Sequence, residues 1–342
     1  MPVVPPVNLR VLVRGGSGLL GAPAVRALVA RGHDVTVLTR GTRPAPAGAA
    51  SLAADARDPA ALARALAGVR VDVVLDLLAY EAADVERLFA VPGFATSRYL
   101  MVSTGQVYLV AAERTPPFVE AHAERPAMAE PEPGTSDHAN WAYGMGKRGA
   151  ERAARAAGER TGARVTALRL PVVQGANDTT RRLWAYLARL RDGAPLLLPG
   201  GGRDPVRFVW AEDVARAVVT LAEGAPAPAF AYNVAMPDEP SLVELVAAAA
   251  ALLGVPARVV PCGWDDLAPA GLDRGVSPFS GPWCSRPDPA AARRDWGFEG
   301  SPVARWLPEV VRAHLAEAGP VRHPADVHRD AERSLAERLA GR

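Results

Sequence analysis

Apolar runs and helical patterns alternate along the first half of the chain. Short runs rich in β-branched residues are followed by segments with the periodicity of amphipathic helices, which is typical of βαβ units. The pattern predicts strands over residues 9–13, 34–38, 71–78, 98–103 and 164–170, and helices over 23–31, 59–67 and 141–160. Strands separated by helices predict an α/β Rossmann fold, a doubly wound parallel sheet with helices on both faces.

The pattern changes after Pro171, where loops lengthen and proline and glycine cluster. The stretches 207–221 and 230–234 still have the pattern of the sheet domain. The sequence therefore predicts a sheet domain of 1–174 plus about 205–236, and a smaller, discontinuous substrate-binding domain of about 175–204 plus 237–319. The Pro-rich, acidic stretch 110–140 is long for a simple connection and predicts a functional loop. The charged tail 320–342 is expected to be a solvated terminal helix.

A glycine-rich turn joins the first predicted strand to the first predicted helix. Gly15, Gly18 and Gly21 give the spacing G-x-x-G-x-x-G, with Leu19 and Leu20 between the last two. In such a turn the first glycine permits the tight bend, the second lets a pyrophosphate approach the backbone, and the third lets helix and strand pack closely. The helix N-terminus offers amide groups and a positive dipole end to the phosphates. The turn therefore predicts dinucleotide binding rather than a purely structural bend.

The residues after the second strand bear on which dinucleotide is bound. NAD-specific folds place an acidic residue about 20 residues beyond the glycines, but here the second strand ends with Thr39 and Arg40. Arg40, together with Arg14 before the glycines, suits a 2′-phosphate. This favours NADP(H), with NAD(H) as the alternative; Arg40 could instead stack on adenine or face solvent. Asp55 is either an acceptor for the adenine amino group or a loop carboxylate without a ligand.

Tyr143 and Lys147 lie four residues apart in the long predicted helix. At this spacing the two side chains share one helix face, about 6 Å apart along the axis. A free phenol has a pKa near ~10, and an adjacent ammonium group favours the phenolate. Tyr143 can then exchange a proton with a substrate hydroxyl or carbonyl while a hydride moves to or from nicotinamide.

Two hydroxyl groups follow the predicted strand 98–103 at its carboxyl end, where ligands bind in open α/β sheets. Thr104 is expected to hydrogen-bond and orient the reacting oxygen. Ser103 is interpreted mainly as a turn-capping residue, and it is also expected to contact the cofactor.

With these motifs the chain resembles the extended short-chain dehydrogenase/reductases, also called the NAD-dependent epimerase/dehydratase family. The matching motifs occur in the family's order over roughly residues 9–300 and are the glycine turn, Ser103-Thr-Gly-Gln-Val-Tyr108, Tyr143-Gly-Met-Gly-Lys147, Leu168-Arg-Leu-Pro171, Gly175, Arg207-Phe-Val-Trp-Ala-Glu-Asp213 and Tyr232-Asn233-Val. The resemblance implies Tyr143 as acid/base, Lys147 as its activator and a ribose ligand, and Thr104 as the third catalytic residue. It also implies Pro171 as a cofactor contact, a C-terminal substrate domain and a homodimer.

The stretch 72–80 looks more like the atypical, reductase-like members, which implies that Ala79 lines the cofactor. Asp76, on an apolar strand, is either a paired structural carboxylate or a functional one.

Three departures from the family's pattern bear on the substrate. The catalytic threonine of sugar-nucleotide 4,6-dehydratases is followed by Asp-Glu, but Thr104 is followed by Gly105 and Gln106, so that dehydration is not expected. Val172 stands where many sugar-nucleotide members have an asparagine that binds the diphosphate. The arginine that grips their nucleotide is displaced here by one residue, to Arg207, and such a slip in a strand turns the side chain to the opposite face.

A phosphate could still be reached by Arg203 or Arg207 through a bulge or loop. The substrate contacts predicted from the sequence are Thr104, Gln106, Arg207 and Arg286.

Composition excludes several classes of protein. The 39 Lys and Arg nearly balance the 37 Asp and Glu, for a formal charge of +2, so no strong field favours nucleic acid or membrane partners. The two cysteines, Cys262 and Cys284, are interpreted as thiols of a reducing cytoplasm, and the sequence contains no metal-ligand cluster with sensible spacing. The N-terminus lacks the pattern of a signal peptide, and no apolar run is long enough to span a bilayer. A cytoplasmic protein is expected.

Three functions remain open on the sequence. The first is an NAD(P)-dependent oxidoreductase or epimerase acting on a secondary alcohol or ketone of a sugar nucleotide or similar polar metabolite. The second, favoured by Val172 and the offset of Arg207, is an NADPH-dependent reductase of a non-nucleotide carbonyl compound. The third is a non-catalytic, cofactor-sensing or RNA-binding family member; the retained tyrosine–lysine pair and the near-neutral charge argue against it.

Overall fold

The computed structural model describes residues 8–316 and 324–341, and the chain divides into two compact units. Unit 1 consists of the described chain up to Val173, Val209–Ala235 and Ser285–Gly300. Unit 2 consists of Gln174–Phe208, Met236–Cys284 and the described chain from Ser301 onward. The sequence assigned 285–300 to the second domain, but this segment belongs to unit 1. Two hydrogen bonds attach it there: Phe118 N–H donates to the carbonyl oxygen of Arg286 at 2.9 Å, and Asp288 N–H donates to that of Phe118 at 2.8 Å.

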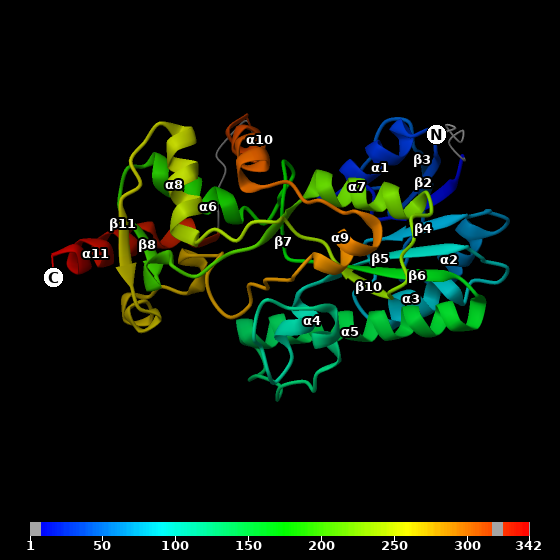
Figure 1. Cartoon of the computed structure of the whole chain (residues 1–342), viewed down its shortest axis with the longest axis horizontal. Helices are drawn as coiled ribbons and strands as arrows, with labels where there is room; N and C mark the ends of the chain where they lie inside the picture. Colours follow the sequence, from blue (N-terminus) through cyan, green and yellow to red (C-terminus); the bar gives the residue numbers. More distant parts are fainter. Residues whose placement is uncertain (1–7, 317–323, 342) are drawn as a thin grey trace. The chain divides into compact units, whose positions relative to one another are not determined.

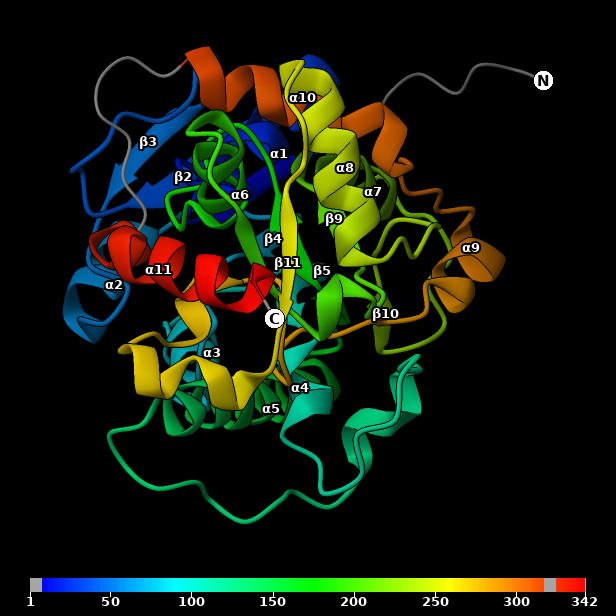
Figure 2. The same cartoon turned by 90° about the vertical axis from the view of Figure 1, so that its left-hand side faces the viewer.

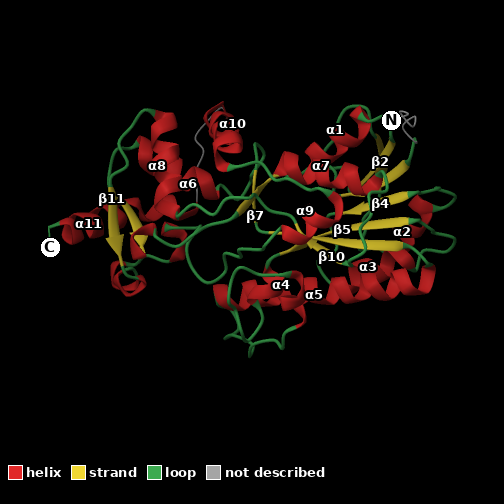
Figure 3. Cartoon of the chain, viewed as in Figure 1, coloured by secondary structure: helices red, strands yellow, loops and turns green. Residues whose placement is uncertain are grey.

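Unit 1 contains a seven-stranded parallel sheet, and the predicted doubly wound fold is confirmed (Figures 1 and 3). The strands, in spatial order, are β10 (Ala231–Asn233), β6 (Arg164–Leu170), β5 (Arg98–Thr104), β4 (Val73–Asp76), β1 (Arg10–Arg14), β2 (Asp34–Thr39) and β3 (Ala50–Ala53). The chain order reverses between β1 and β4, which is the switch point where open α/β sheets bind ligands. The sequence did not predict β3, because its residues are small and it lies at the edge of the sheet.

Helices cover both faces of this sheet (Figure 1), and each face has its own apolar core between the sheet and the helices. One face carries α1 (Gly21–Ala30) and α7 (Ala211–Ala222), and the other carries α2 (Pro59–Leu66), α3 (Ala82–Phe89) and α5 (Ser136–Thr161). Helix α5 begins five residues before the predicted start, because the Thr135 hydroxyl caps the His138 amide at 3.1 Å. It ends at Thr161, and the following Gly162 takes a left-handed φ of 76°.

Three further helices of unit 1 are short. They are α4 (Gln106–Leu109), the 3₁₀ helix η1 (Glu120–Glu124) and α9 (Ala290–Trp296). Helix η1 lies within the predicted functional loop 110–140, which is anchored by a β-bridge between Ala111 and Ala127 and by the buried side chain of Phe118. This anchoring explains the order of the loop; its functional role stays a prediction.

Unit 2 combines a two-stranded parallel sheet with four helices (Figure 2). The strands are β8 (Leu196–Pro199) and β11 (Val259–Cys262), and the helices are α6 (Arg182–Arg191), α8 (Leu242–Leu253), α10 (Val303–Ala316) and α11 (Arg329–Ala340). Five short 3₁₀ helices connect them: η2 (Gly200–Gly202), η3 (Trp264–Asp266), η4 (Ala268–Ala270), η5 (Arg274–Val276) and η6 (Pro324–His328). A further short pair joins β7 (Val172–Gln174) to β9 (Phe208–Trp210). No helix of the described chain is long and apolar enough to cross a membrane.

The prediction of a solvated terminal helix is wrong for α11. Leu335 and Ala336 are buried in a core cluster that includes Leu197 of β8. Glu332 is fully buried and accepts a hydrogen bond from Arg189 Nε of α6 at 2.9 Å. The high charge of the tail predicted exposure to water. The carboxylate of Glu332 is instead buried in unit 2, where an arginine neutralises its charge.

Candidate active site

The glycine turn passes from β1 to α1 with little room for side chains. Gly15 has a left-handed φ of 93°, and a Cβ on it would lie 3.1 Å from the side chain of Leu78. A Cβ on Gly21 would lie 2.1 Å from the carbonyl oxygen of Gly15, so glycine is required for the close approach of helix and turn. Around Gly18, by contrast, a Cβ would meet no heavy atom within 4 Å. The turn is closed on its inner side and open at Gly18.

The open part of this turn fits an anionic dinucleotide. Helix α1 starts after Leu20 without a side-chain cap and without an acidic residue in its first turn. Neither the cap nor the first turn of α1 thus supplies a carboxylate to its terminal amides and dipole, which favours a bound diphosphate. Leu19 and Leu20 are half-buried and complete the turn.

The structure excludes Arg14 as a ligand of a 2′-phosphate. Its side chain is 1% exposed and forms an ion pair with Asp76 inside the sheet domain. Asp76 also accepts a hydrogen bond of 2.7 Å from the hydroxyl of Tyr99. Arg14 is thus held between neighbouring strands, and Asp76 is the paired structural carboxylate of the two alternatives.

Arg40 has the exposure that a phosphate ligand needs. It follows β2 directly, and Arg43 is also exposed in the same loop. Sequence reasoning overlooked Arg43, although its distance of three residues from Arg40 was available as a signal. Asp55 is exposed, and its Oδ1 accepts a hydrogen bond from the Arg57 amide at 2.9 Å, so the carboxylate shapes a local turn.

Lys147 is buried beside the carboxyl end of β5. Its side chain is 2% exposed, and Nζ donates a hydrogen bond to the carbonyl oxygen of Val102 at 2.9 Å. Burial lowers the pKa of Lys147 from 10.5 to about 8, against the opposing effect of carboxylates that include Asp76. Tyr143, one helical turn earlier, is 39% exposed and therefore accessible to a ligand. Thr104 ends β5 two residues after Val102 and is half-buried.

Two glycines between these residues let α5 approach its neighbours. A Cβ on Gly144 would lie 2.5 Å from the side chain of Val110, and one on Gly146 would lie 2.8 Å from the carbonyl oxygen of Tyr80. The spacing Tyr143-Gly-Met-Gly-Lys147 therefore has a packing reason in addition to its chemistry. Sequence reasoning used the tyrosine and the lysine but missed the role of the glycines.

The loop after β4 connects the glycine turn to the predicted catalytic pair. Leu78 faces Gly15, and the ring of Tyr80, two residues later, lies 4.8 Å from Lys147 Nζ, measured to the ring centroid. Ala79, between them, is fully buried in the core under α2, α3 and α5. Its methyl group faces the core, so the predicted cofactor contact of Ala79 could be made by its backbone alone and stays a prediction.

Ser103 belongs to a buried polar network and not to the open side of the site. Its hydroxyl donates to Glu151 Oε1 at 2.5 Å, and Arg169 Nη2 pairs with Glu151 Oε2 at 2.7 Å. Arg169 Nη1 also reaches the hydroxyl of Tyr108 at 3.2 Å, and that hydroxyl donates to Asn233. The Ser103 hydroxyl therefore neither caps the turn nor faces a cofactor, and both expectations for this side chain are corrected. This network links β5, β6, β10 and α5.

The two residues after Thr104 supply no acid to the site. A Cβ on Gly105 would lie 2.0 Å from the hydroxyl oxygen of Ser285, so Ser285 already fills the space beside Gly105. Gln106 is half-buried at the start of α4, and its Nε2 lies 3.5 Å from Asn140 Oδ1. Sequence reasoning missed Ser285, since no spacing rule brings residues 105 and 285 together.

The remaining predicted contacts are divided between the two units. Arg286 is half-buried in unit 1, and Pro171 is buried at the end of β6. Arg207 lies in unit 2, where its Nε is 3.4 Å from Glu239 Oε1, so its charge is balanced within that unit.

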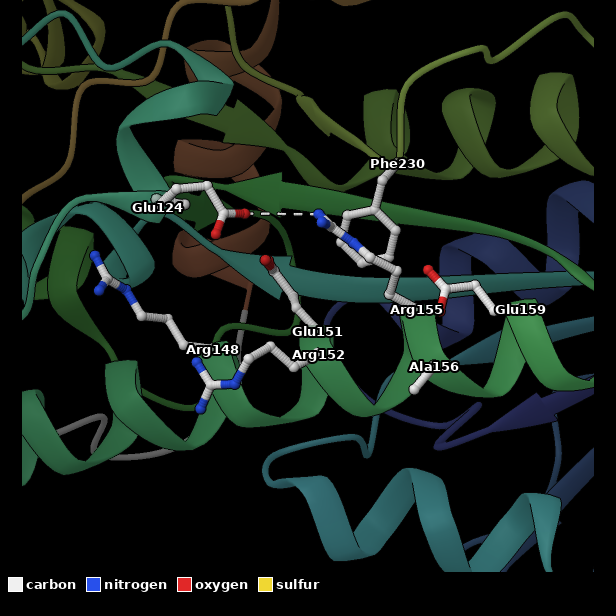
Figure 4. A pocket seen from close by; sticks show the side chains of 9 residues that line it. Glu124, Arg148, Glu151, Arg152, Arg155, Ala156, Glu159 and Phe230 are labelled. Carbon is white, nitrogen blue, oxygen red and sulfur yellow. Dashed lines mark ion pairs between the residues drawn. The ribbon is translucent and has the colours of Figure 1, made fainter.

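A charged cavity of about 310 Å³ adjoins α5 further along the helix (Figure 4). Three arginines of α5, Arg148, Arg152 and Arg155, line it together with Glu124 and two other glutamates. The guanidinium of Arg155 lies 4.3 Å from the ring centroid of Phe230 and 3.6 Å from Glu124. With arginines and glutamates balanced in its wall, this cavity has no clear charge preference for a ligand, and it contains none of the predicted catalytic residues.

Lys147 is the only lysine of the chain; the other 38 basic side chains counted with it are arginines. Arginine stays charged in proteins, whereas a buried lysine can titrate near neutral pH. The single lysine thus lies where the predicted proton transfer needs a titratable ammonium group. The sequence alone showed that this lysine is unique, but the argument from the spacing of Tyr143 and Lys147 did not use it.

Comparison with known proteins agrees with this geometry. The model of the NAD dependent epimerase/dehydratase family matches residues 11–235. A 2′-dehydrokanamycin reductase of Streptomyces kanamyceticus is 33% identical over 222 residues, which cover 63% of this chain and 58% of that protein. The match thus spans less than two thirds of the length of this relative.

Solved structures share the fold at low sequence identity. A UDP-glucose 4-epimerase of Thermotoga maritima, with UDP-glucose, has a TM-score of 0.71 and 17% identity over 90% of this chain and 99% of its own. A dTDP-glucose 4,6-dehydratase of Streptomyces venezuelae, with NAD, has a TM-score of 0.67 and 21% identity over 90% of this chain and 97% of its own. At these identities the similarity establishes the fold alone.

Proposed function

This chain belongs to the NAD-dependent epimerase/dehydratase family, and from that premise we propose that it is an NADPH-dependent reductase of a ketone in a polar, non-nucleotide metabolite. The observation that carries the proposal is the loop after β4, which places Leu78 beside Gly15 and, two residues later, the ring of Tyr80 beside Lys147 and the accessible Tyr143. It supports a dinucleotide on the glycine turn whose reactive end lies near the proton donor.

Each residue of the pair has one task in this reaction. The nicotinamide, when bound, supplies the hydride to the carbonyl carbon. Tyr143 donates its phenolic proton to the carbonyl oxygen, which becomes the hydroxyl of the product. Lys147 favours the phenolate that remains by its positive charge, and Thr104 holds the reacting oxygen by a hydrogen bond.

Dehydration is disfavoured by what surrounds Thr104, and the match to a reductase favours net reduction over epimerisation. No carboxylate follows Thr104, and Ser285 fills the space beside Gly105 that an acidic side chain would need. The match to a reductase and Val172, which offers no side-chain hydrogen bond, support a substrate without a nucleotide.

The first test uses Tyr143→Phe, which removes the proton and keeps the ring. Wild-type protein is mixed with NADPH and 2′-dehydrokanamycin, and the loss of absorbance at 340 nm is followed. We expect turnover that falls by ~10²–10⁴-fold in the variant, with unchanged NADPH binding and melting temperature. Undiminished turnover in Tyr143→Phe would remove the catalytic assignment. Conversion of UDP-glucose to an epimer without consumption of NADPH would support the sugar-nucleotide alternative.

The choice of NADP rests on Arg40, since Arg14 is committed to Asp76. Arg40→Ala should weaken NADPH binding roughly tenfold and leave NADH binding unchanged, because a charged hydrogen bond to the 2′-phosphate is lost. Fluorescence titration with both nucleotides measures this. Arg64→Ala, in α2, is the control and should change neither affinity. Equal affinity of the wild-type protein for NADH and NADPH would contradict the preference.

A further inference from the structure

Tyr80 lies against both members of the catalytic pair. Its ring centroid is 4.8 Å from Lys147 Nζ and 6.3 Å from the ring centroid of Tyr143, with the two rings inclined at 48°. Tyr80 is 48% exposed, whereas Lys147 is 2% exposed. The phenol of Tyr80 therefore stands between a buried ammonium group and the solvent side of the site.

The backbone of Tyr80 is held in place from two sides. Its amide donates a hydrogen bond to Asp84 Oδ2 at 2.9 Å, and Asp84 Oδ1 is in turn bound to Arg87 Nη2 at 2.6 Å. The carbonyl oxygen of Tyr80 lies against Gly146 of α5, where a Cβ would be 2.8 Å away. The ring thus has a fixed anchor beside α5, although much of its surface is exposed.

The contact between the Tyr80 ring and the Lys147 ammonium is favourable for a cation that is buried away from water. Its three N–H groups need partners, and Val102 O accepts one at 2.9 Å. The negative face of an aromatic ring is a second favourable partner for a cation. The carbonyl oxygen of Val102 and the ring of Tyr80 thus lie against the same ammonium group.

The charged groups around Lys147 come from several elements. Asp76 on β4, Asp84 on α3 and Glu151 on α5 favour the ammonium form, while burial disfavours it. Asp76 and Glu151 are themselves neutralised by Arg14 and Arg169. Because these carboxylates are already paired, a contact with an uncharged ring can change the pKa of Lys147.

We propose that Tyr80 is a positioning residue of the active site, whose ring face holds the Lys147 ammonium in place beside Tyr143. Tyr80 acts through Lys147 and not on the substrate. The inference deepens the proposed function and rests on it for its meaning in catalysis. The contact itself can be tested without substrate or cofactor.

The single lysine of the chain makes that test direct. Protein labelled with ¹³C at the lysine ε-carbon gives one side-chain resonance, and its chemical shift is followed from pH 6 to 11. Wild-type protein should titrate with a midpoint of about 8. In Tyr80→Leu the midpoint should fall by about half to one pH unit, because the cation loses the ring. In Tyr80→Phe, which keeps the ring, the midpoint should not move.

Tyr80→Trp provides a change in the opposite direction, since indole binds cations more strongly than phenol does. Its midpoint should lie at or above that of the wild-type protein. Melting temperature and NADPH binding establish that each variant is folded. A midpoint in Tyr80→Leu equal to the wild-type value would overturn the proposal, as would equal shifts in the leucine and phenylalanine variants.

Turnover gives the second readout. If ketone reduction is observed, Tyr80→Leu should lose activity at lower pH than the wild-type protein, while Tyr80→Phe should keep the wild-type pH profile. If no ketone is reduced, the proposed function fails, but the lysine titration still decides whether the ring stabilises the ammonium. The two failures are therefore distinguishable.

Discussion

At the scale of single residues, Lys147 combines a cost in stability with the proposed role in chemistry. Its ammonium is buried, and its pKa is lowered to about 8 mainly by that burial. A lysine whose pKa is depressed in the folded state destabilises the fold at pH values below the folded pKa. This penalty disappears as the pH rises towards the unfolded pKa, because the neutral amine is then buried instead.

Lys147→Met should therefore make the protein more stable at pH 7 while it removes catalysis. We expect a gain of about 1–3 kcal/mol in the free energy of unfolding, reduced by the lost hydrogen bond to Val102. The gain should shrink between pH 8 and pH 10.5. Urea unfolding of the variant and the wild-type protein at matched pH values measures it. A gain that does not depend on pH would contradict the burial of a charged Lys147.

The glycine turn offers a residue-scale test that separates folding from binding. Gly21→Ala should destabilise the protein, because the new methyl group collides with the carbonyl of Gly15. Gly18→Ala meets no neighbour within 4 Å and should leave the melting temperature nearly unchanged, yet weaken NADPH binding at least roughly tenfold. Fluorescence titration and thermal unfolding of both variants decide this. Wild-type NADPH affinity in Gly18→Ala would show that no phosphate approaches this position.

At the scale of elements, β1 and the strand beside it are joined by two arginine–aspartate pairs four residues apart along the strand. Arg10 pairs with Asp72 near the surface, with side chains 44% and 28% exposed, whereas Arg14 and Asp76 are buried. A buried ion is costly once its partner is removed, while an exposed one is hydrated.

Asp76→Ala should cost about 3–5 kcal/mol, since it leaves Arg14 buried without its main partner. Asp72→Ala should cost less than ~1 kcal/mol at neutral pH. The pKa of Asp72 is lowered to about 2, chiefly by its hydrogen bond with Arg10, so its small contribution is lost as the pH falls from about 4 to 2. Chemical denaturation of both variants gives the comparison. Equal costs would contradict the different burial of the two pairs.

At the scale of the whole molecule, α11 packs the end of the described chain against α6 and β8 of unit 2. Glu332→Ala should lower stability by about 3 kcal/mol, because Arg189 stays buried without its buried partner and keeps the half-buried Asp326 at 3.4 Å. Glu337→Ala, exposed on the same helix, should have almost no effect. Both variants should bind NADPH as the wild-type protein does, because the glycine turn lies in unit 1. Thermal unfolding and fluorescence titration check these outcomes; equal melting temperatures would contradict the role of the buried carboxylate.

The sequence by itself determined those features that depend on residues close together along the chain. The alternation of strands and helices, the glycine turn at the end of β1, and Tyr143 and Lys147 one turn apart on α5 all follow from local periodicity and spacing. The edge strand β3 and the early start of α5 escaped this reasoning, because the first depends on its neighbour β2 and the second on a single capping hydroxyl.

Only the tertiary structure decided what several of those residues do. Arg14 binds Asp76, 62 residues away, and not a phosphate. Ser103 binds Glu151, Ala79 faces the core, Ser285 fills the space beside Gly105, and Tyr80 reaches Lys147. Burial and pairing depend on which distant segments pack into one core. The free energy of a charged or hydroxyl group depends on this burial and pairing, and the spacing of residues along the chain does not encode them.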